Sequence, residues 1–325
     1  MYRLTYWLVV VLVATTAQLL MAVDPLVKPF PPKIEHPSDN PTTPAKVSLG
    51  KKLFFDTRLS QTEKISCSSC HDPAKAWTDG RQFAIGVHGR VGKRNTPSLF
   101  NVAYNEHQFW NGRVLTLEKQ ALEPIKHPSE MNMNLSKLVV KLEEIEEYRT
   151  AFLDAFDGSV TPENIGKAIA AFERMIISKE AAIDRYSRGE KAALSATARR
   201  GMNLFFGDAR CHLCHSGPNF SDQKFHNIGV GVAARDQGRS LVTSRVKDHG
   251  AFKTPTLREV AHTAPYMHDG SIKTLEAVVK HYNFGGVTDA ENPTRDELLE
   301  VLYLSEKQVS DLVVFLKEGL SSPTK

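Results

Sequence analysis

The 325-residue sequence predicts a mainly α-helical fold that contains two copies of one domain with long loops. Three observations predict it. Apolar residues recur at helical spacing, no segment gives a strong run of alternating strand residues, and short motifs recur in the same order in both halves. Hydrophobic residues make up 41% and charged residues 24% of the chain, which is a globular composition. The formal net charge of +4 is too small for a nucleic-acid binder that relies on a basic surface.

Residues 1–22 are predicted to be a signal peptide. Arg3 is the only charged residue before Asp24, an unbroken apolar run covers residues 8–13, and Ala22 is a plausible cleavage position. Because Leu20 is not the usual small residue, an uncleaved membrane anchor stays open as the alternative. The sequence has no second membrane-spanning run. We therefore expect a periplasmic protein that makes no membrane contact once the signal is removed.

Residues 23–44 are predicted to be a proline-rich N-terminal arm, either a tether or a wrapped extended segment, because no helix tolerates this proline density. Further along, residues 135–155 are predicted to be one helix, and its acidic cluster at 143–147 is either a solvated face or a docking patch for a partner. Residues 161–177 are predicted to be another helix, since Thr161 can cap it and Pro162 and Glu163 suit its first turn.

The chemistry of the chain is carried by two Cys-x-x-Cys-His motifs, which use all four cysteines. The motifs consist of Cys67, Cys70 and His71, and of Cys211, Cys214 and His215. This is the attachment signature of c-type haem, in which two cysteines form thioethers to the porphyrin and the histidine ligates iron. A zinc ribbon has no need of a histidine after both pairs, and a thioredoxin-type site needs one pair. The sequence therefore predicts two covalently bound haems c.

An internal repeat surrounds these motifs. Gly50-Lys-Lys-Leu-Phe-Phe55 precedes the first motif as Gly201-Met-Asn-Leu-Phe-Phe206 precedes the second. Three further pairs share a shift of 158 residues: Thr96–Leu99 with Thr254–Leu257, Asn111-Gly112 with Asp269-Gly270, and Thr116–Glu118 with Thr274–Glu276. Several matches in one order predict two duplicated cytochrome c-type haem domains. We place the first haem domain at residues 45–180 and the second at residues 181–325.

The same shift predicts that the two haems differ in coordination. It matches Pro124 with Tyr282 and Trp110 with His268. If Tyr282 ligates the second iron together with His215, the first iron faces a proline, which cannot ligate, and keeps an open position for peroxide. Two alternatives stay open for the second site: Tyr282 is a core aromatic residue, or Met267 is the ligand.

The motifs resemble those of the bacterial di-haem cytochrome c peroxidase superfamily over residues 45–320, nearly the whole mature chain. Besides the haem motifs, the stretches that carry the resemblance are Leu53–Asp56, Arg94–Pro97, Phe109–Arg113, Glu130-Met131 and Pro265–Gly270. Classical members have methionine where this chain has Tyr282. A tyrosine there resembles the MauG branch, whose members use peroxide to oxidise residues of a partner protein.

The resemblance implies several roles. Trp110 is expected to relay electrons between the haems, and Glu130 and Gln120 are expected to belong to the peroxide pocket, where Glu130 acts as acid and base. Asn95, with the carbonyls of Thr263 and Pro265, is expected to hold one calcium ion, which prefers such oxygen ligands.

The loop histidine of the family is displaced by one residue in this chain. Classical members have a loop histidine that can cap the first haem, but here Val87 occupies that position and His88 lies one residue beyond it. His88 is either a haem ligand or a solvent-facing residue.

Structural roles are the alternatives for the other residues. Trp110 can be a packing anchor, Glu130 a surface or helix-cap carboxylate, and His268 a buried histidine that supports a haem propionate or orders a water. Five histidines are expected to be ordinary loop residues: His36, His107, His127, His226 and His249.

Two functions follow from these residues. The first is a peroxidase that uses hydrogen peroxide at the open haem, shares the oxidising equivalents with the second haem, and passes them on. The recipient is a small redox protein, either a cytochrome c or a cupredoxin, or a client protein whose aromatic residues are oxidised. The alternative is a pure di-haem electron-transfer cytochrome, which predicts that both irons are six-coordinate.

Overall fold

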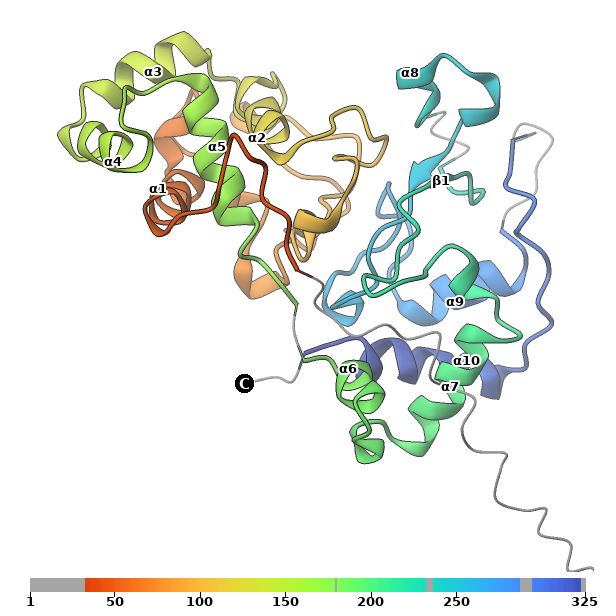
Figure 1. Cartoon of the computed structure of the whole chain (residues 1–325). Helices are drawn as coiled ribbons and strands as arrows, with labels where there is room; N and C mark the ends of the chain where they lie inside the picture. The colour runs from red at the N-terminus through yellow and green to blue at the C-terminus, as the bar shows by residue number, and fades with distance from the viewer. Residues whose placement is uncertain (1–32, 179, 232–235, 287–293, 323–325) are drawn as a thin grey trace, which may run out of the picture.

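The computed structural model describes residues 33–178, 180–231, 236–286 and 294–322 (Figure 1). The predicted signal peptide at 1–22 and the first part of the arm lie outside these residues. Within the described ranges, no helix is both long enough and apolar enough to cross a membrane.

The structure is helix-rich with little sheet, as predicted. The helices are α1 (Pro44–Phe55), α2 (Leu117–Lys126), α3 (Leu135–Glu143), α4 (Glu146–Phe156), α5 (Pro162–Glu173), α6 (Ala182–Ser187), α7 (Ala196–Phe206), α8 (Ser240–Thr243), α9 (Leu275–Asn283) and α10 (Glu306–Val314). Short 3-10 turns and loops join them. Two strands, β1 (Phe225–His226) and β2 (Phe252–Lys253), pair antiparallel.

Three local predictions can be compared with these elements. The helix expected from Thr161 is α5: the Thr161 hydroxyl accepts the Asn164 amide, although the helix ends at Glu173. The single helix expected over residues 135–155 is wrong, because the chain breaks after Glu143 and Glu146 begins a new helix. Acidic residues favour a helix N-terminus, where their charge complements the dipole, so this cluster starts α4. The arm ends one residue earlier than expected, since Pro44 is the first residue of α1.

The hydrophobic residues form two clusters that are built alike. One gathers around α1 and α5 and the other around α7 and α10 (Figure 1). At the first helix contact, a Cβ on Gly50 would lie 1.9 Å from the carbonyl oxygen of Ala168; at the second, a Cβ on Gly201 would lie 2.0 Å from that of Asp311. Each glycine begins the repeated Gly-x-x-Leu-Phe-Phe motif. The motif therefore lets two helix backbones approach closely in each half.

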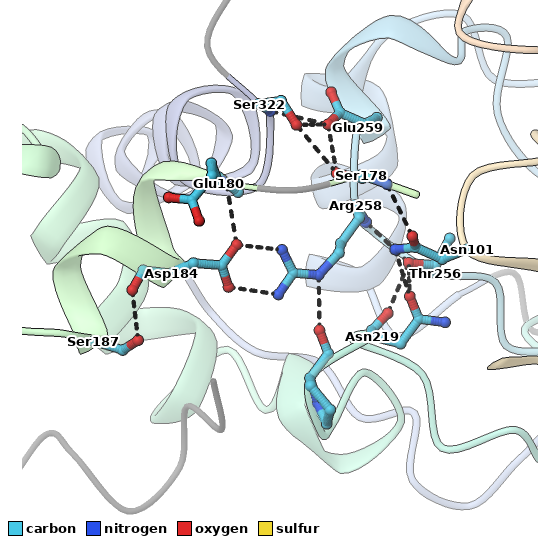
Figure 2. A network of polar contacts seen from close by, with 12 residues as sticks. Asn101, Ser178, Glu180, Asp184, Ser187, Asn219, Thr256, Arg258, Glu259 and Ser322 are labelled. Atoms are coloured by element: carbon cyan, nitrogen blue, oxygen red, sulfur yellow. Dashed lines mark hydrogen bonds and ion pairs between the residues drawn. The ribbon is translucent and has the colours of Figure 1, made fainter. Parts of the chain in front are cut away.

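The connection between the halves is held by a symmetric set of hydrogen bonds (Figure 2). Asn101 and Glu259 occupy matching positions in the repeat, and both have a φ of +62°. The side chain of Asn101 accepts the Ser178 amide at 3.0 Å, and the side chain of Glu259 accepts the Ser322 amide at 3.0 Å. The Ser178 hydroxyl also donates to Glu259 at 2.5 Å. Ser178 therefore joins equivalent residues of both halves.

A buried ion pair lies beside this connection (Figure 2). The guanidinium of Arg258 donates two hydrogen bonds to Asp184, at 2.7 and 2.8 Å, and both side chains are fully buried. A third bond from Arg258 reaches the carbonyl of Pro218 at 2.8 Å. The bidentate geometry and the third acceptor offset the cost of removing both charges from water.

Candidate functional site

Each haem motif folds into the same 3-10 turn, which sets the orientation of its histidine. In the second motif, the His215 amide donates to the Cys211 carbonyl at 2.9 Å, and His215 Nδ1 lies 3.0 Å from the Phe220 carbonyl. The acceptor requires the proton on Nδ1, which leaves Nε2 as the ligand atom. Burial lowers the pKa of His215, so the ring is held neutral, as iron ligation requires.

The first motif repeats this geometry. The His71 amide donates to the Cys67 carbonyl at 2.9 Å, and His71 Nδ1 lies 3.0 Å from the Trp77 carbonyl. Burial lowers the pKa of His71 as well. All four cysteines are free thiols, so each sulfur is available for a thioether. The donor set of both motifs fits a covalently bound haem.

Matching aromatic rings pack against the residues whose carbonyls bond the two haem histidines. Phe54 makes an edge-on contact with Trp77, with ring centroids 5.9 Å apart. Phe205 makes the equivalent contact with Phe220, also at 5.9 Å. A third ring, Phe172 in the first half and Phe315 in the second, packs on the same phenylalanine. In both halves, aromatic packing therefore fixes the residue whose carbonyl accepts the hydrogen bond from the haem histidine.

A cavity of about 270 Å³ adjoins the second motif and reaches the first half. Its wall brings together predicted site residues that are far apart in sequence: Cys211, Cys214, His215, Tyr282, Trp110, Asn95, Thr263 and Pro265. Met267, the alternative iron ligand, and His268 also line it.

Tyr282 and Pro124 lie at matching positions of equivalent helices. Thr274 caps the N-terminus of α9, where its hydroxyl accepts the Ala277 amide at 3.1 Å, and Thr116 caps α2 in the same way. Eight residues beyond each cap lie Tyr282 and Pro124. Burial raises the pKa of Tyr282, so a phenolate there needs a neighbouring cation such as ferric iron.

The expected peroxide residues lie on and after α2. Gln120 is half-buried on the helix, and the Glu130 side chain, 40% exposed, follows it in a turn. Desolvation raises the pKa of Glu130, while the nearby charges of His127 and Arg113 oppose the rise. His127 Nδ1 lies 3.5 Å from the Glu130 carboxylate, a proximity that the sequence did not reveal.

The loop that contains Val87 and His88 packs against Glu130. The Val87 amide donates to the Glu130 carbonyl at 2.8 Å, and a Cβ on Gly86 would lie 2.1 Å from the Ser129 carbonyl oxygen. Val87 is buried, whereas His88 is exposed and its Nε2 lies 3.3 Å from the Gln61 side chain. The structure thus places His88 at the surface, as in the solvent-facing alternative.

Trp110 lies at the contact between the halves. Its indole nitrogen donates to the Asn95 carbonyl at 2.8 Å, and its own carbonyl accepts the Lys253 amide at 2.8 Å. The repeat matches Trp110 with His268, and the carbonyl of His268 makes the equivalent contact by accepting the Asn95 amide at 2.7 Å. His268 is buried and stacks on Phe252 at 3.6 Å; burial lowers its pKa to about 4.

The expected calcium residues share one region of the cavity wall. Asn95 is buried, and its side-chain amide donates to the Arg81 carbonyl at 2.8 Å. That bond uses the nitrogen and leaves the oxygen for a cation. Thr263 and Pro265 line the same cavity. Calcium binding by this set stays a prediction.

His226 is a cavity residue that sequence reasoning missed. We expected an ordinary loop histidine, but Nε2 lies 2.9 Å from Asp222 and Nδ1 lies 2.5 Å from Asp296. Hydrogen bonds to Asp222, to the Cys214 sulfur and to Asp296 raise the pKa of His226 to about 11. Cys214, Asp222 and His226 lie close enough to hold a metal ion. However, a thioether at Cys214 would remove the thiolate, so we interpret His226 as a charged group at the cavity edge.

Lys253 is a cavity cation with no acidic partner among the described residues. Arg258 and Arg210, which also line the cavity, pair with Asp184 and Glu300. Lys253 is buried, and no acidic side chain among the residues that the structure describes pairs with it. Burial lowers its pKa to about 8. A haem brings two propionate groups, so this buried ammonium fits the cofactor that the motifs require.

Comparisons with known proteins agree with this chemistry. The family model described as di-haem cytochrome c peroxidase matches residues 44–192. The methylamine utilization protein MauG of Methylorubrum extorquens is 41% identical over 90% of this chain and 83% of its own length. The cytochrome-c peroxidase IdrP1 of Denitromonas iodatirespirans is 38% identical over 98% of this chain and 92% of its own.

A solved structure shows the same fold. The crystal structure of a MauG-like protein associated with microbial copper homeostasis superposes with a TM-score of 0.82 and 34% identity. The match covers 93% of this chain and 95% of that one.

Proposed function

Because the chain belongs to the di-haem cytochrome c peroxidase family, we propose that it is a periplasmic peroxidase of two duplicated haem domains with unequal haem sites. The chain is an oxidoreductase that acts on hydrogen peroxide, and its family implies two c-type haems. The first motif would hold the haem that takes peroxide, and the second motif would hold a haem that accepts and passes on oxidising equivalents. The predicted signal peptide supports the periplasmic location.

The observation that carries this proposal is the contrast between Pro124 and Tyr282 on equivalent helices. A proline has no donor atom for iron, whereas a phenolate is an anionic ligand that stabilises oxidised iron. The first site is therefore open to substrate and the second is suited to hold an oxidising equivalent.

The side chains at each motif would attach and orient the haem. Cys67 and Cys70 at the first site, and Cys211 and Cys214 at the second, would form the thioethers. His71 and His215 would ligate iron through Nε2. Lys253 would pair with a propionate of the haem beside the second motif, because no acidic side chain in the described part of the chain pairs with this cavity cation. When bound, the haems supply the redox chemistry of peroxide reduction.

Glu130 would move the proton that peroxide cleavage needs. As a carboxylate it would accept a proton from one peroxide oxygen and return it to the other, so that the second oxygen can leave as water when the O–O bond breaks. Its raised pKa suits both steps, since the group then titrates closer to neutral pH. Gln120 would orient peroxide by hydrogen bonding.

Trp110 would relay electrons between the sites, since it lies at the contact between the halves. A calcium ion on Asn95, Thr263 and Pro265 would stiffen this contact, because the Asn95 carbonyl also accepts the Trp110 indole hydrogen. Two electrons per peroxide would come from a cytochrome c or a cupredoxin, or from aromatic residues of a client protein.

A resting-state spectrum tests the proposal. We expect one high-spin haem with an open position and one low-spin haem, by visible and electron paramagnetic resonance spectroscopy, and a fast spectral change on adding peroxide. Two low-spin haems and no reaction with peroxide would instead identify a pure electron-transfer cytochrome.

A further inference from the structure

Tyr303 combines a strained backbone with an exposed ring. Its φ is +56°, in the left-handed region that disfavours residues with a large side chain, and the residue is 87% exposed. Folding gains little from an aromatic residue that buries so little surface, and glycine or asparagine would adopt this backbone more easily. The fold therefore gives no reason for a tyrosine at this position.

The neighbours of Tyr303 belong to the second haem site. Leu302 and Leu304 both line the cavity that also contains Tyr282. Residues 294–305 lead into α10 (Figure 1), and the bridge between Phe284 and Val301 holds this segment beside the end of α9. Tyr303 is thus the solvent-facing member of a segment whose adjacent side chains form the cavity wall.

Hydrogen bonds connect this segment to the residue that follows the candidate iron ligand. The Leu302 amide donates to the Asn283 carbonyl at 3.0 Å. The Asn283 side chain accepts the Leu304 amide at 2.8 Å and donates to the Leu304 carbonyl at 3.1 Å. Asn283 is covalently bonded to Tyr282. A short path of peptide and hydrogen bonds therefore leads from Tyr282 to both neighbours of Tyr303.

Two exposed apolar side chains and an ion pair fix the segment that contains Tyr303. Phe284, 70% exposed, forms an antiparallel bridge with Val301, which is 47% exposed. Glu300 pairs with Arg210, the residue before Cys211. The segment is thus anchored to the haem motif on one side and to α9 on the other.

We propose that Tyr303 is the redox-active surface residue through which a protein donor delivers electrons to the second haem site. This inference rests on the proposed function, since it needs an oxidising equivalent at that site. Electrons tunnel faster along bonded paths than across gaps, and the contacts through Asn283 provide such a path. The exposed phenol is also accessible to the surface of a partner.

The step balances in electrons and protons. Tyr303 gives one electron to the oxidised second site and its phenolic proton to water, which leaves a neutral tyrosyl radical. A reduced donor protein returns one electron, and water returns the proton. Two such cycles supply the two electrons that reduce one hydrogen peroxide to two water molecules with two solvent protons.

Three variants test the relay in the haem-loaded protein: Tyr303→Phe, Tyr303→Trp, and Tyr104→Phe as a half-buried tyrosine control. Each is mixed with peroxide, and the oxidation of reduced mitochondrial cytochrome c is followed by stopped flow, with ferrocyanide as the small donor. Freeze-quench electron paramagnetic resonance, without donor, detects the tyrosyl radical.

We expect Tyr303→Phe to react with peroxide at the wild-type rate, to lose the tyrosyl signal and to oxidise cytochrome c about tenfold more slowly. Tyr303→Trp should restore most of the rate, since tryptophan is oxidisable, and ferrocyanide oxidation should not change. A phenylalanine retains the aromatic surface, so a docking role alone would leave the rate intact.

The relay would be overturned if Tyr303→Phe oxidised cytochrome c at the rate of the wild-type protein, or if Tyr303→Trp failed to restore that rate. In both cases the reaction with peroxide would still support the proposed function. Absence of any peroxide reaction in the wild-type protein would overturn both.

Discussion

The two halves of the molecule are alike behind each haem histidine and different in front of it. His71 and His215 bond to the carbonyls of Trp77 and Phe220 at the same 3.0 Å, and matching aromatic rings support both turns. On α2, Pro124 stands at the position that Tyr282 occupies on α9. The difference teaches that the geometry of the two histidine turns is kept while one position on the equivalent helices changes, and the proposed division between a peroxide site and an electron-storing site rests on that position.

The halves also differ in buried charge. Arg258 of the second half pairs with Asp184, whereas the matching position of the first half is Phe100, which is half-buried. A hydrophobic residue needs no partner, but a buried guanidinium does. The second half therefore depends on an ion pair that the first half lacks.

Replacing Tyr282 with phenylalanine should make the two haems alike. We expect complete conversion of the second haem to an open, high-spin form and a higher reduction potential, because the anionic ligand that stabilises ferric iron is lost. Visible spectra and redox titration measure both effects. Tyr266→Phe is the matched control, since Tyr266 lines the same cavity but donates its hydroxyl to the Val260 carbonyl. If the second haem stays six-coordinate in Tyr282→Phe, Met267 becomes the favoured ligand.

Replacing Arg258 with methionine should destabilise the protein strongly. The substitution leaves Asp184 buried without its partner, which costs about 3–5 kcal/mol in the free energy of unfolding. Denaturant titration measures the change. Lys126→Met, which breaks an exposed pair with Glu123 on α2, should have little effect. An equal loss in both variants would show that burial of the Arg258 pair is not the cause.

The sequence predicted those parts of the site that local spacing determines. The haem motifs, the cap at Thr161 and the equivalence of Pro124 with Tyr282 all follow from residues close together or from the repeat. The position of His226 between Asp222 and Asp296 could not be predicted, because it requires segments about seventy residues apart to meet. The break between α3 and α4 was missed because apolar spacing continues across it.

Replacing Glu130 with glutamine should slow the peroxide reaction about a hundredfold, the usual scale for loss of a positioned acid and base. We propose this role for Glu130 at the first site alone, so the substitution should slow the peroxide reaction without changing the second haem. Stopped-flow mixing with peroxide measures the rate, and unchanged haem spectra exclude a ligand effect. A wild-type rate in this variant would assign Glu130 to a structural role.

A smaller difference between the halves concerns Asp222. It accepts the Lys224 amide at 3.0 Å, as Asp79 of the first half accepts the Arg81 amide at 3.0 Å. Only Asp222 gains an imidazole, because His226 lies where the first half has Phe83. His226 and its two carboxylates thus make a pH-dependent contribution to the free energy of unfolding, and the first half has no histidine at the matching position to do the same.

The pH dependence of this contribution follows from the raised pKa. Hydrogen bonds to Asp222 and Asp296 hold the pKa of His226 above the value of about 6.5 near which an unfolded histidine titrates. The folded state therefore binds the proton more tightly than the unfolded chain, so the stabilisation is fully present below about pH 6.5 and is lost as pH rises through the raised pKa. His226→Gln should lower the free energy of unfolding by about 1.5 kcal/mol at pH 6, the scale of a hydrogen bond to a charged group. The difference should shrink as pH rises through the raised pKa, measured by urea titration at several pH values. His262→Gln, at an exposed site, is the control, and a loss that does not vary with pH would assign His226 to packing alone.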